Sequence, residues 1–252
     1  MKTIHPQHVY SIAQPLERGS NNYYFIIQGV KSLSIRLRVW GDYALFSRPE
    51  MKVERVSYDV MTPSAARGLV EAIFWHPGMQ WYIERIRVCK PIRYMNLRRN
   101  EVKATLNANT ARTVMNRGKG QLYLSARDEI QQRASLLLRD VEYVIEAHFE
   151  MTDKAAPSDN PGKFQDIIKR RISRGQFYHQ PYLGCREFPA QFRPSEEIPP
   201  CPPELLGEKD LGFMLWDLDY TDPQNIQPLF FRAKLNDGVL SVPARDSREV
   251  YG

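Results

Sequence analysis

Hydrophobic residues alternate with other residues in three segments of the chain. The first covers residues 33–40, where every second residue is hydrophobic and two arginines lie between them. The second covers residues 141–149. In the third, residues 81–88, the alternation shifts by one residue near Glu84, as a β-bulge would cause. A period of two is that of a half-buried strand, so we expect three strands, the first with a basic outer face.

Two other segments have the spacing of an amphipathic helix. The first begins at Thr62, which suits the N-cap, and Pro63, which suits the first turn, and it ends before residues 77–78. Its hydrophobic positions are Ala66, Leu69, Val70, Ile73 and Phe74. The second helix has Phe164, Ile167, Ile168 and Ile172 on one side and ends at Gly175. Its exposed side is predicted to carry Lys163, Lys169, Arg170, Arg171 and Arg174.

The order of these elements predicts an α+β fold with two domains. Residues 1–31 have little periodicity and are expected to be an N-terminal extension. Strand, helix, strand, strand, helix and strand then follow over residues 32–195, which is the order of a ferredoxin-like (RRM-like) domain. Residues 91–138 have a weak pattern and are expected to be a basic insertion with hairpin or loop character. A proline-rich boundary precedes residues 196–252, a small antiparallel β-sheet domain with a hairpin turn at residues 236–238.

Charge is distributed unevenly along the 252 residues. The formal net charge is +6, yet residues 85–139 contain 13 basic and 3 acidic side chains, and residues 195–252 contain 5 basic and 11 acidic ones. A basic segment of this size indicates a polyanion partner such as nucleic acid, because each Lys or Arg placed against a phosphate releases counterions. The alternative is a solvated surface whose charge is merely uneven.

Composition excludes several classes of protein. Hydrophobic residues make up 42% of the chain, which is enough for a packed core. No apolar run approaches the ~20 residues that a membrane-spanning helix needs, and the N-terminus does not resemble a secretory signal, so the expected location is the cytoplasm, away from any membrane.

Metal and cofactor signals are weak. The three cysteines, Cys89, Cys185 and Cys201, are widely spaced and predict reduced thiols rather than disulfides or a zinc site. The pair His5 and His8 is a weak metal signal, and we expect neither a metal nor a cofactor. No phosphate loop, dinucleotide-binding glycine motif or nucleophile elbow is present.

A long segment of the sequence is similar to a known signature. Residues 36–68 read RLRVWGDYALFSRPEMKVERVSYDVMTPSAARG, and shorter matches follow in order at residues 98–102, 146–150, 160–163, 182–188 and 228–231. This series resembles the CRISPR-associated Cas-five family, d variant, of subtype I-C systems, within the repeat-associated (RAMP) superfamily.

The resemblance implies a function and a set of partners. It implies an endoribonuclease that cuts precursor CRISPR RNA at each repeat without a metal ion, through attack by a 2′-hydroxyl that leaves a 2′,3′-cyclic phosphate. It also implies that the protein stays bound to the 5′ handle of the mature CRISPR RNA, among the other subunits of the type I-C interference complex. Target double-stranded DNA is a further candidate partner. The alternative is a non-catalytic RNA-binding scaffold of the same complex.

The resemblance also points to catalytic positions. Family members with a described site use a Tyr at the end of the first helix and a Lys-His pair at the start of the second, and in this chain these positions hold Phe74, Lys163 and Phe164. Lys163 is a candidate for stabilising charge on the phosphate. Neither phenylalanine transfers a proton, so a substitute is needed. Histidine suits proton transfer near neutral pH, and His179, after the second helix, is the first candidate, with His76 and Tyr178 as alternatives.

Basic residues in and near the signature, in the insertion and on the second helix are the candidate RNA ligands. An RNA hairpin is recognised mainly through its shape, phosphates and 2′-hydroxyls. The candidates are Arg48, Lys52, Arg55, Arg67, Arg98, Arg99, Arg117, Lys119, Lys169, Arg170 and Arg171.

Overall fold

The computed structural model describes residues 25–27, 30–51 and 53–252. Lys52, His5 and His8 therefore lie outside the described residues, as does most of the expected N-terminal extension. The helices are α1 (Pro63–Ile73), α2 (Ala108–Arg117), α3 (Pro161–Arg174) and a 3-10 helix at Pro203–Leu205. The strands are β1 (Phe25–Ile27), β2 (Val30–Ala44), β3 (Arg55–Val56), β4 (Met79–Val88), β5 (Tyr94–Val102), β6 (Ile130–Met151), β7 (Gln191–Pro194), β8 (Glu208–Asp219), β9 (Gln227–Asn236), β10 (Val239–Ser241) and β11 (Val250–Tyr251).

The eleven strands found in the described residues form one sheet. Its central part has the order β7-β2-β6-β4, and each neighbouring pair there is antiparallel. Beyond β4 the sheet continues through β10, β9 and β11, while β8 pairs with β9. β1 pairs with β2, and both β3 and β5 pair with β6, with β3 parallel to it. The fold is α+β with a mostly antiparallel sheet and few helices, as expected from the sequence.

The predicted strands and helices occur where the sequence patterns place them. The alternating segments lie within β2, β4 and β6, and the register of β4 against β6 shifts between Ile83 and Arg85, which confirms the predicted bulge. At the start of α1 the Thr62 hydroxyl accepts a hydrogen bond from the Ala65 N–H, 3.2 Å. At the end of α3 Gly175 adopts a left-handed conformation (φ 63°) that stops the helix.

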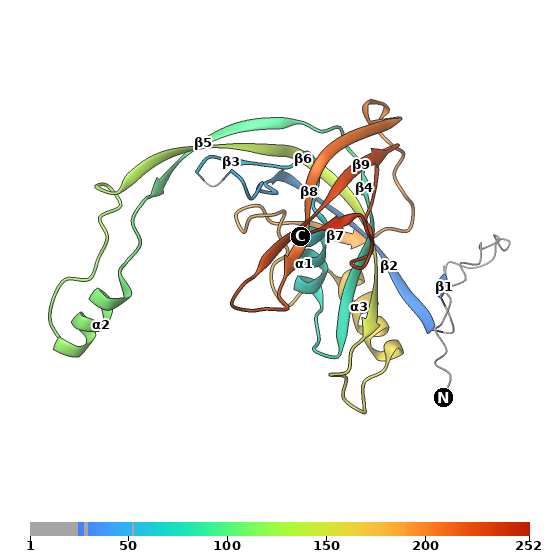
Figure 1. The fold of residues 1–252 in the computed structure, drawn as a ribbon, viewed down its shortest axis with the longest axis horizontal. Helices are drawn as coiled ribbons and strands as arrows, with labels where there is room; N and C mark the ends of the chain where they lie inside the picture. The colour runs from blue at the N-terminus through green and yellow to red at the C-terminus, as the bar shows by residue number, and fades with distance from the viewer. Residues whose placement is uncertain (1–24, 28–29, 52) are drawn as a thin grey trace, which may run out of the picture.

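The insertion is more regular than its sequence pattern suggests. β5 and the first part of β6 form a hairpin arm that extends away from the rest of the molecule and carries α2 near its tip (Figure 1). We did not predict α2, because none of its residues is buried and it therefore has no apolar face in contact with a core. Its ends nevertheless carry ordinary caps, the Asn107 side chain at the start and Gly118 (φ 62°) at the end. The insertion is thus a hairpin with a helix in its connection.

Strand β6 connects the arm to the core of the sheet. Its residues up to Leu138 pair with β5, and residues from Tyr143 onward pair with β4. Between these two parts Asp140 has φ 52°, and its carboxylate lies 2.5 Å from Lys90 Nζ. A single 22-residue strand therefore passes from the arm into the core and changes partner near Asp140.

The two faces of the central sheet differ in chemistry. One face is apolar and packs against the helices, and Phe149 of β6 contacts Phe164 of α3 with ring centroids 6.2 Å apart. The other face carries ion pairs between neighbouring strands, including Arg38 Nη2 with Glu142 Oε1 at 2.5 Å. Arg38, expected on the outer face of β2, is therefore paired with a glutamate of β6.

The C-terminal strands are joined to the rest of the protein by strand pairing and by an ion pair. β10 pairs with β4, so the sheet is continuous across the proline-rich stretch. The Arg67 guanidinium of α1 makes two bonds to the Asp217 carboxylate of β8, at 2.6 and 2.9 Å. The predicted hairpin turn is present, with Asp237 and Gly238 both at positive φ. Among the helices described, none has the length and apolar character needed to cross a membrane.

Candidate active site and basic surface

The end of α1 meets the start of α3 through two phenylalanines. The rings of Phe74 and Phe164 meet edge to face, with centroids 5.7 Å apart. Both side chains are buried, Phe164 almost completely. The structure therefore brings together the two positions where the family resemblance implies proton-transfer residues, but in this chain both positions belong to the core.

His76 lies directly beside this pair. Its ring centroid is 4.9 Å from that of Phe164, and its side chain is 38% exposed, so solvent reaches it. The His76 Nδ1 atom accepts a hydrogen bond from the Gly78 N–H, 3.1 Å. We infer from this bond that the neutral ring carries its proton on Nε2. His76 was only an alternative candidate in the sequence, and the structure makes it the histidine packed on the Phe164 position.

Asp159 links His76 to Lys163. Its Oδ1 atom lies 2.8 Å from Lys163 Nζ, and its Oδ2 atom lies 3.8 Å from His76 Nδ1. The Asp159 side chain is 4% exposed, whereas that of Lys163 is 46% exposed. The Lys163 ammonium group, through its hydrogen bond, holds the pKa of the Asp159 carboxyl below its ordinary value. Asp159 thus fixes the predicted cation next to a histidine and remains ionised.

His179 and Tyr178 lie at the same end of α1. The backbone N–H groups of both residues donate to the Ala72 carbonyl, at 3.1 and 2.9 Å, and their rings are 4.3 Å apart. Arg171 donates to the next carbonyl, that of Ile73, at 2.6 Å. The last carbonyls of α1 therefore anchor the segment after α3, and His179 and Tyr178, two of the three predicted substitutes for the family residues, are exposed beside this helix end.

Exposed aromatic residues surround the same helix end, and of these only Tyr178 was among the candidates named from the sequence. Trp75, between Phe74 and His76, is 56% exposed, and Phe177 and Tyr178 are also exposed. Exposed aromatic rings are platforms on which unpaired RNA bases stack. The signal in the sequence was the run Phe74, Trp75 and His76 at the end of a predicted helix.

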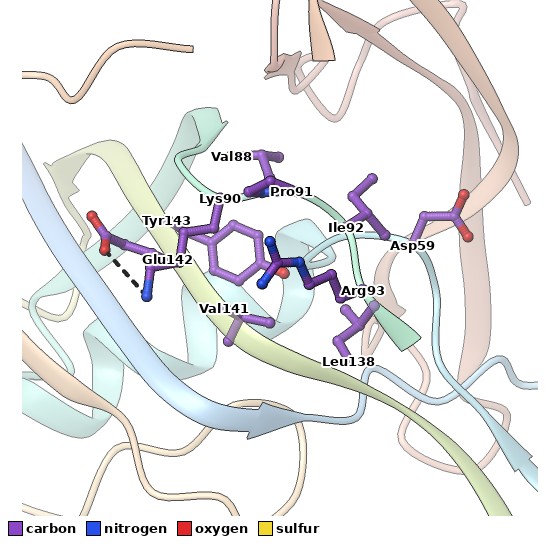
Figure 2. A pocket seen from close by; sticks show the side chains of 10 residues that line it. All are labelled: Asp59, Val88, Lys90, Pro91, Ile92, Arg93, Leu138, Val141, Glu142 and Tyr143. Carbon is purple, nitrogen blue, oxygen red and sulfur yellow. Dashed lines mark ion pairs between the residues drawn. The ribbon is translucent and has the colours of Figure 1, made fainter. Parts of the chain in front are cut away.

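A small pocket lies elsewhere, where β4, β5 and β6 meet, and Figure 2 shows the side chains that line it. Tyr143 is fully buried there, and this burial raises the pKa of its hydroxyl far above the ordinary value. Lys90 Nζ at the pocket lies 4.0 Å from Glu142 Oε2. None of the lining residues belongs to the cluster at the end of α1, so the pocket is separate from the candidate site.

Three of the predicted RNA ligands outside the arm and its arginine–glutamate contacts have partners within the protein. Arg48 Nη2 is 3.6 Å from Asp59 Oδ1, and Arg67 is held by Asp217 as described above. Arg171 is engaged by the end of α1. These arginines have a structural role whether or not they also contact a ligand.

The other predicted ligands fall into two groups. Arg55 and Arg99 lie together at the base of the arm, where they share the carboxylate of Glu101. Among the predicted ligands, those that are exposed and form no ion pair within the described part of the chain are Arg98 on β5, Arg117 and Lys119 near α2, and Lys169 and Arg170 on α3. Two distant surfaces, the arm and α3, therefore carry unpaired positive charge.

The cysteine side chains are free thiols, as expected. Burial raises the pKa of the Cys89 thiol to about 11, and burial also raises the pKa of the Cys185 thiol. Within the described ranges, no group of three His, Cys, Asp or Glu side chains is arranged to hold a metal ion.

Comparison with known proteins gives the family. The family model for CRISPR-associated protein (Cas_Cas5), d variant, matches residues 34–243. The chain belongs to the Cas5d family. Two curated relatives are named CRISPR pre-crRNA endoribonuclease Cas5d. The protein from Mannheimia succiniciproducens is 48% identical over 221 residues, covering 86% of this chain and 97% of the relative. The protein from Thermus thermophilus is 41% identical over 235 residues, covering 86% and 94%.

Solved structures agree with the fold. A CRISPR-associated protein aligns with a TM-score of 0.62 at 22% identity, covering 87% of this chain and 96% of that one. A functionally uncharacterised protein from Streptococcus mutans aligns with a TM-score of 0.61 at 21% identity, covering 87% and 97%. At these identities the comparison concerns the fold alone.

Gly184 lies in one of the segments that indicated the Cas5d family, and the structure explains why this position holds glycine. In the segment 182–188 the Leu183 carbonyl accepts a hydrogen bond from the Leu45 N–H, 3.0 Å, at the end of β2. Gly184 follows with φ 84°, and a Cβ atom there would lie 2.0 Å from the Leu45 carbonyl oxygen. Only glycine fits this close approach. The segment is therefore fixed against β2, next to the base of the arm.

Proposed function

We propose that this chain is a CRISPR repeat-specific endoribonuclease that cuts precursor CRISPR RNA without a metal ion and stays bound to the 5′ handle in the type I-C interference complex. The observation that carries the proposal is the near full-length match to two curated relatives that are named pre-crRNA endoribonucleases. The proposed location is the cytoplasm, because the substrate is a transcript.

The cluster at the end of α1 supports this proposal, because it contains residue types that metal-free cleavage needs. In this reaction the 2′-oxygen attacks the phosphorus atom and the bond to the 5′-oxygen breaks, which leaves a 2′,3′-cyclic phosphate. One group takes the proton of the 2′-hydroxyl and another gives a proton to the departing 5′-oxygen. We assign these two roles to His76 and His179, and we assign Lys163 to the charge that develops on the phosphate.

The aromatic residues take a different part in this proposal. Phe74 and Phe164 carry no transferable proton, and as buried residues they support the ring of His76. Trp75 and Tyr178 are exposed and suited to stack unpaired bases of the repeat. The RNA backbone is assigned to the unpaired cations of α3 and the arm, together with Arg55 and Arg99.

We also propose the domain organisation expected from the sequence. The strand order β7-β2-β6-β4, with α1 and α3 as the two connecting helices, supports a ferredoxin-like domain over residues 32–195 that the β5–α2–β6 arm interrupts. Residues 196–252 form a C-terminal β-sheet unit, and residues 1–31 an extension. The other subunits of the interference complex, and target double-stranded DNA, remain proposed partners.

A second candidate function is a non-catalytic scaffold that binds the same RNA. The specific observation in its favour is that phenylalanine occupies both family positions for proton transfer. Incubation of the purified protein with its own repeat RNA in EDTA separates the two functions. We expect cleavage at one position within the repeat. RNA that is bound but unchanged would reject the enzyme and support the scaffold.

A further inference from the structure

Three arginines at the base of the arm converge on one carboxylate. Arg55 of β3, Arg99 of β5 and Arg133 of β6 each have a guanidinium nitrogen close to a carboxylate oxygen of Glu101, at 3.4, 3.7 and 3.6 Å respectively. Arg99 also lies 2.7 Å from Glu187 Oε1, in the segment that is fixed against β2. We call these three arginines and two glutamates the arginine cluster.

The strand register alone would make this cluster unfavourable. Arg99 and Arg133 are directly opposite each other across the β5–β6 hairpin. Like charges in such a position repel and destabilise the pair of strands. The cluster has three positive charges against the two negative charges of Glu101 and Glu187, so one positive charge stays unbalanced. The cluster therefore keeps a net positive charge, which attracts an anion such as a phosphate.

The hydrogen-bonding capacity of the cluster is also incompletely used. Arg99 Nε, Arg99 Nη2 and Arg133 Nε are enclosed by protein yet have no hydrogen-bond acceptor. The contact from Arg99 Nη2 to Glu101, at 3.7 Å, is too long for a hydrogen bond. Enclosed donors without acceptors cost free energy, and each needs an explanation. The carboxylates of the cluster therefore leave part of its donor capacity unused.

The five side chains are partly open to solvent. Arg55, Arg99 and Arg133 are 35%, 23% and 30% exposed, and Glu187 is the most open member at 48%. Part of each arginine side chain is therefore reachable from outside, and Glu187 is the carboxylate most open to exchange. The planar guanidinium fork matches the oxygen atoms of a phosphate as well as those of a carboxylate.

We propose that the arginine cluster binds a backbone phosphate of the RNA, which takes the place of Glu187 as the second counter-charge. The inference rests on the proposed function in that its ligand is RNA. It adds Arg133, which was not among the predicted ligands, and it gives Glu187 the role of an internal competitor. Glu101 keeps the three guanidinium groups together before and after the exchange.

The bound phosphate is not the one that is cut. Arg133 and Phe149 lie on the same strand β6, and Phe149 contacts Phe164 at the candidate active site. Sixteen residues separate them, which corresponds to about 50 Å along a straight strand. The strand is curved, but the arm and α3 lie toward different ends of β6 (Figure 1). The cluster therefore contributes to affinity and not to the chemical step.

The test measures RNA affinity at several salt concentrations, with all variants made in the full-length Lys163→Ala background so that cleavage does not interfere. We expect Arg99→Gln and Arg133→Gln each to weaken binding of repeat RNA by about tenfold or more. Each should also reduce the slope of log affinity against log salt by about one unit or slightly less. Glu187→Gln should tighten binding, because it removes the competitor.

Two further variants serve as controls. Arg232→Gln removes one positive charge, as the cluster variants do, but from an exposed ion pair with Asp210 on the C-terminal strands. Its affinity for repeat RNA should equal that of the parent. Arg133→Lys keeps the positive charge but lacks the planar guanidinium group, so it should also weaken RNA binding. Because it keeps the charge, it serves as a second variant at this position if Arg133→Gln fails to fold.

The outcomes distinguish this inference from the proposed function. If the parent binds repeat RNA but Arg99→Gln and Arg133→Gln behave like Arg232→Gln, the phosphate site is rejected and the proposed function stands. Weaker binding by Glu187→Gln would likewise reject the exchange. If the parent does not bind repeat RNA at all, the proposed function fails, and the inference fails with it.

Discussion

Replacement of Lys163 by alanine should lower the rate of repeat cleavage at saturating RNA by about 10²- to 10³-fold. Lys163 is the cation fixed by Asp159 beside His76, and its ammonium group is exposed to a ligand. The charge on the phosphate is greatest in the transition state, so loss of this group should affect the cleavage rate much more than RNA affinity. Single-turnover kinetics with excess protein measure the rate directly.

Lys154→Ala provides the matched control for this substitution. Lys154 is an exposed lysine in the loop before α3, and its backbone N–H, which the substitution keeps, donates to the Thr152 hydroxyl. The variant should cleave at the rate of the unmodified protein. Full activity in Lys163→Ala, or an equal loss in both variants, would remove Lys163 from the mechanism.

The same assay decides the roles of the histidines. Asparagine at position 76 can still accept the hydrogen bond from the Gly78 N–H but transfers no proton, so His76→Asn isolates the chemical role of the ring. We expect His76→Asn and His179→Asn each to slow cleavage by about 10²-fold or more. A variant that cleaves at the unmodified rate excludes its histidine, and Tyr178 is then the next candidate.

Phe164→Ala should reduce the free energy of unfolding by about 3–5 kcal/mol. Phe164 is 1% exposed and touches Phe74, Phe149 and the ring of His76, so truncation leaves a cavity between α1, α3 and β6. Chemical denaturation followed by intrinsic fluorescence measures the change. The expected loss is large because this position is part of the core.

Phe213→Ala is the control for that experiment. Phe213 is 59% exposed on β8, and its truncation should change the free energy of unfolding by less than about 1 kcal/mol. A comparably small change in Phe164→Ala would show that position 164 is not a core position. The ring of Phe164 could then no longer be the rigid support that orients His76.

The parts of the fold with a buried face were predictable from the sequence. Strands β2, β4 and β6 and helices α1 and α3 each place hydrophobic residues at a regular spacing, since one side of each packs on the core. Helix α2 has no buried residue, so its sequence lacks the spacing of hydrophobic residues that predicts a helix packed on a core. Its capping residues Asn107 and Gly118 were the only local cues, and alone they do not distinguish a helix from a turn.

The candidate site was predictable only in part. The family resemblance pointed to positions 74, 163 and 164, and the structure brings Phe74 and Phe164 into contact. His76 was named from the sequence only as an alternative, and its proximity to Asp159 could not be predicted, because 83 residues separate the two and only the packing of α1 against α3 makes them neighbours. The same holds for Arg133, whose position opposite Arg99 depends on the register of the arm.

The central claim, cleavage by the 2′-hydroxyl of the RNA itself, is tested most directly with a single altered nucleotide. The cut position is first mapped with unmodified repeat RNA in EDTA, and a repeat is then made with 2′-deoxyribose on the 5′ side of that linkage. We predict that this RNA binds normally but is not cut there, while the unmodified RNA yields a 2′,3′-cyclic phosphate. Cleavage of the deoxy linkage at the normal rate would contradict the mechanism.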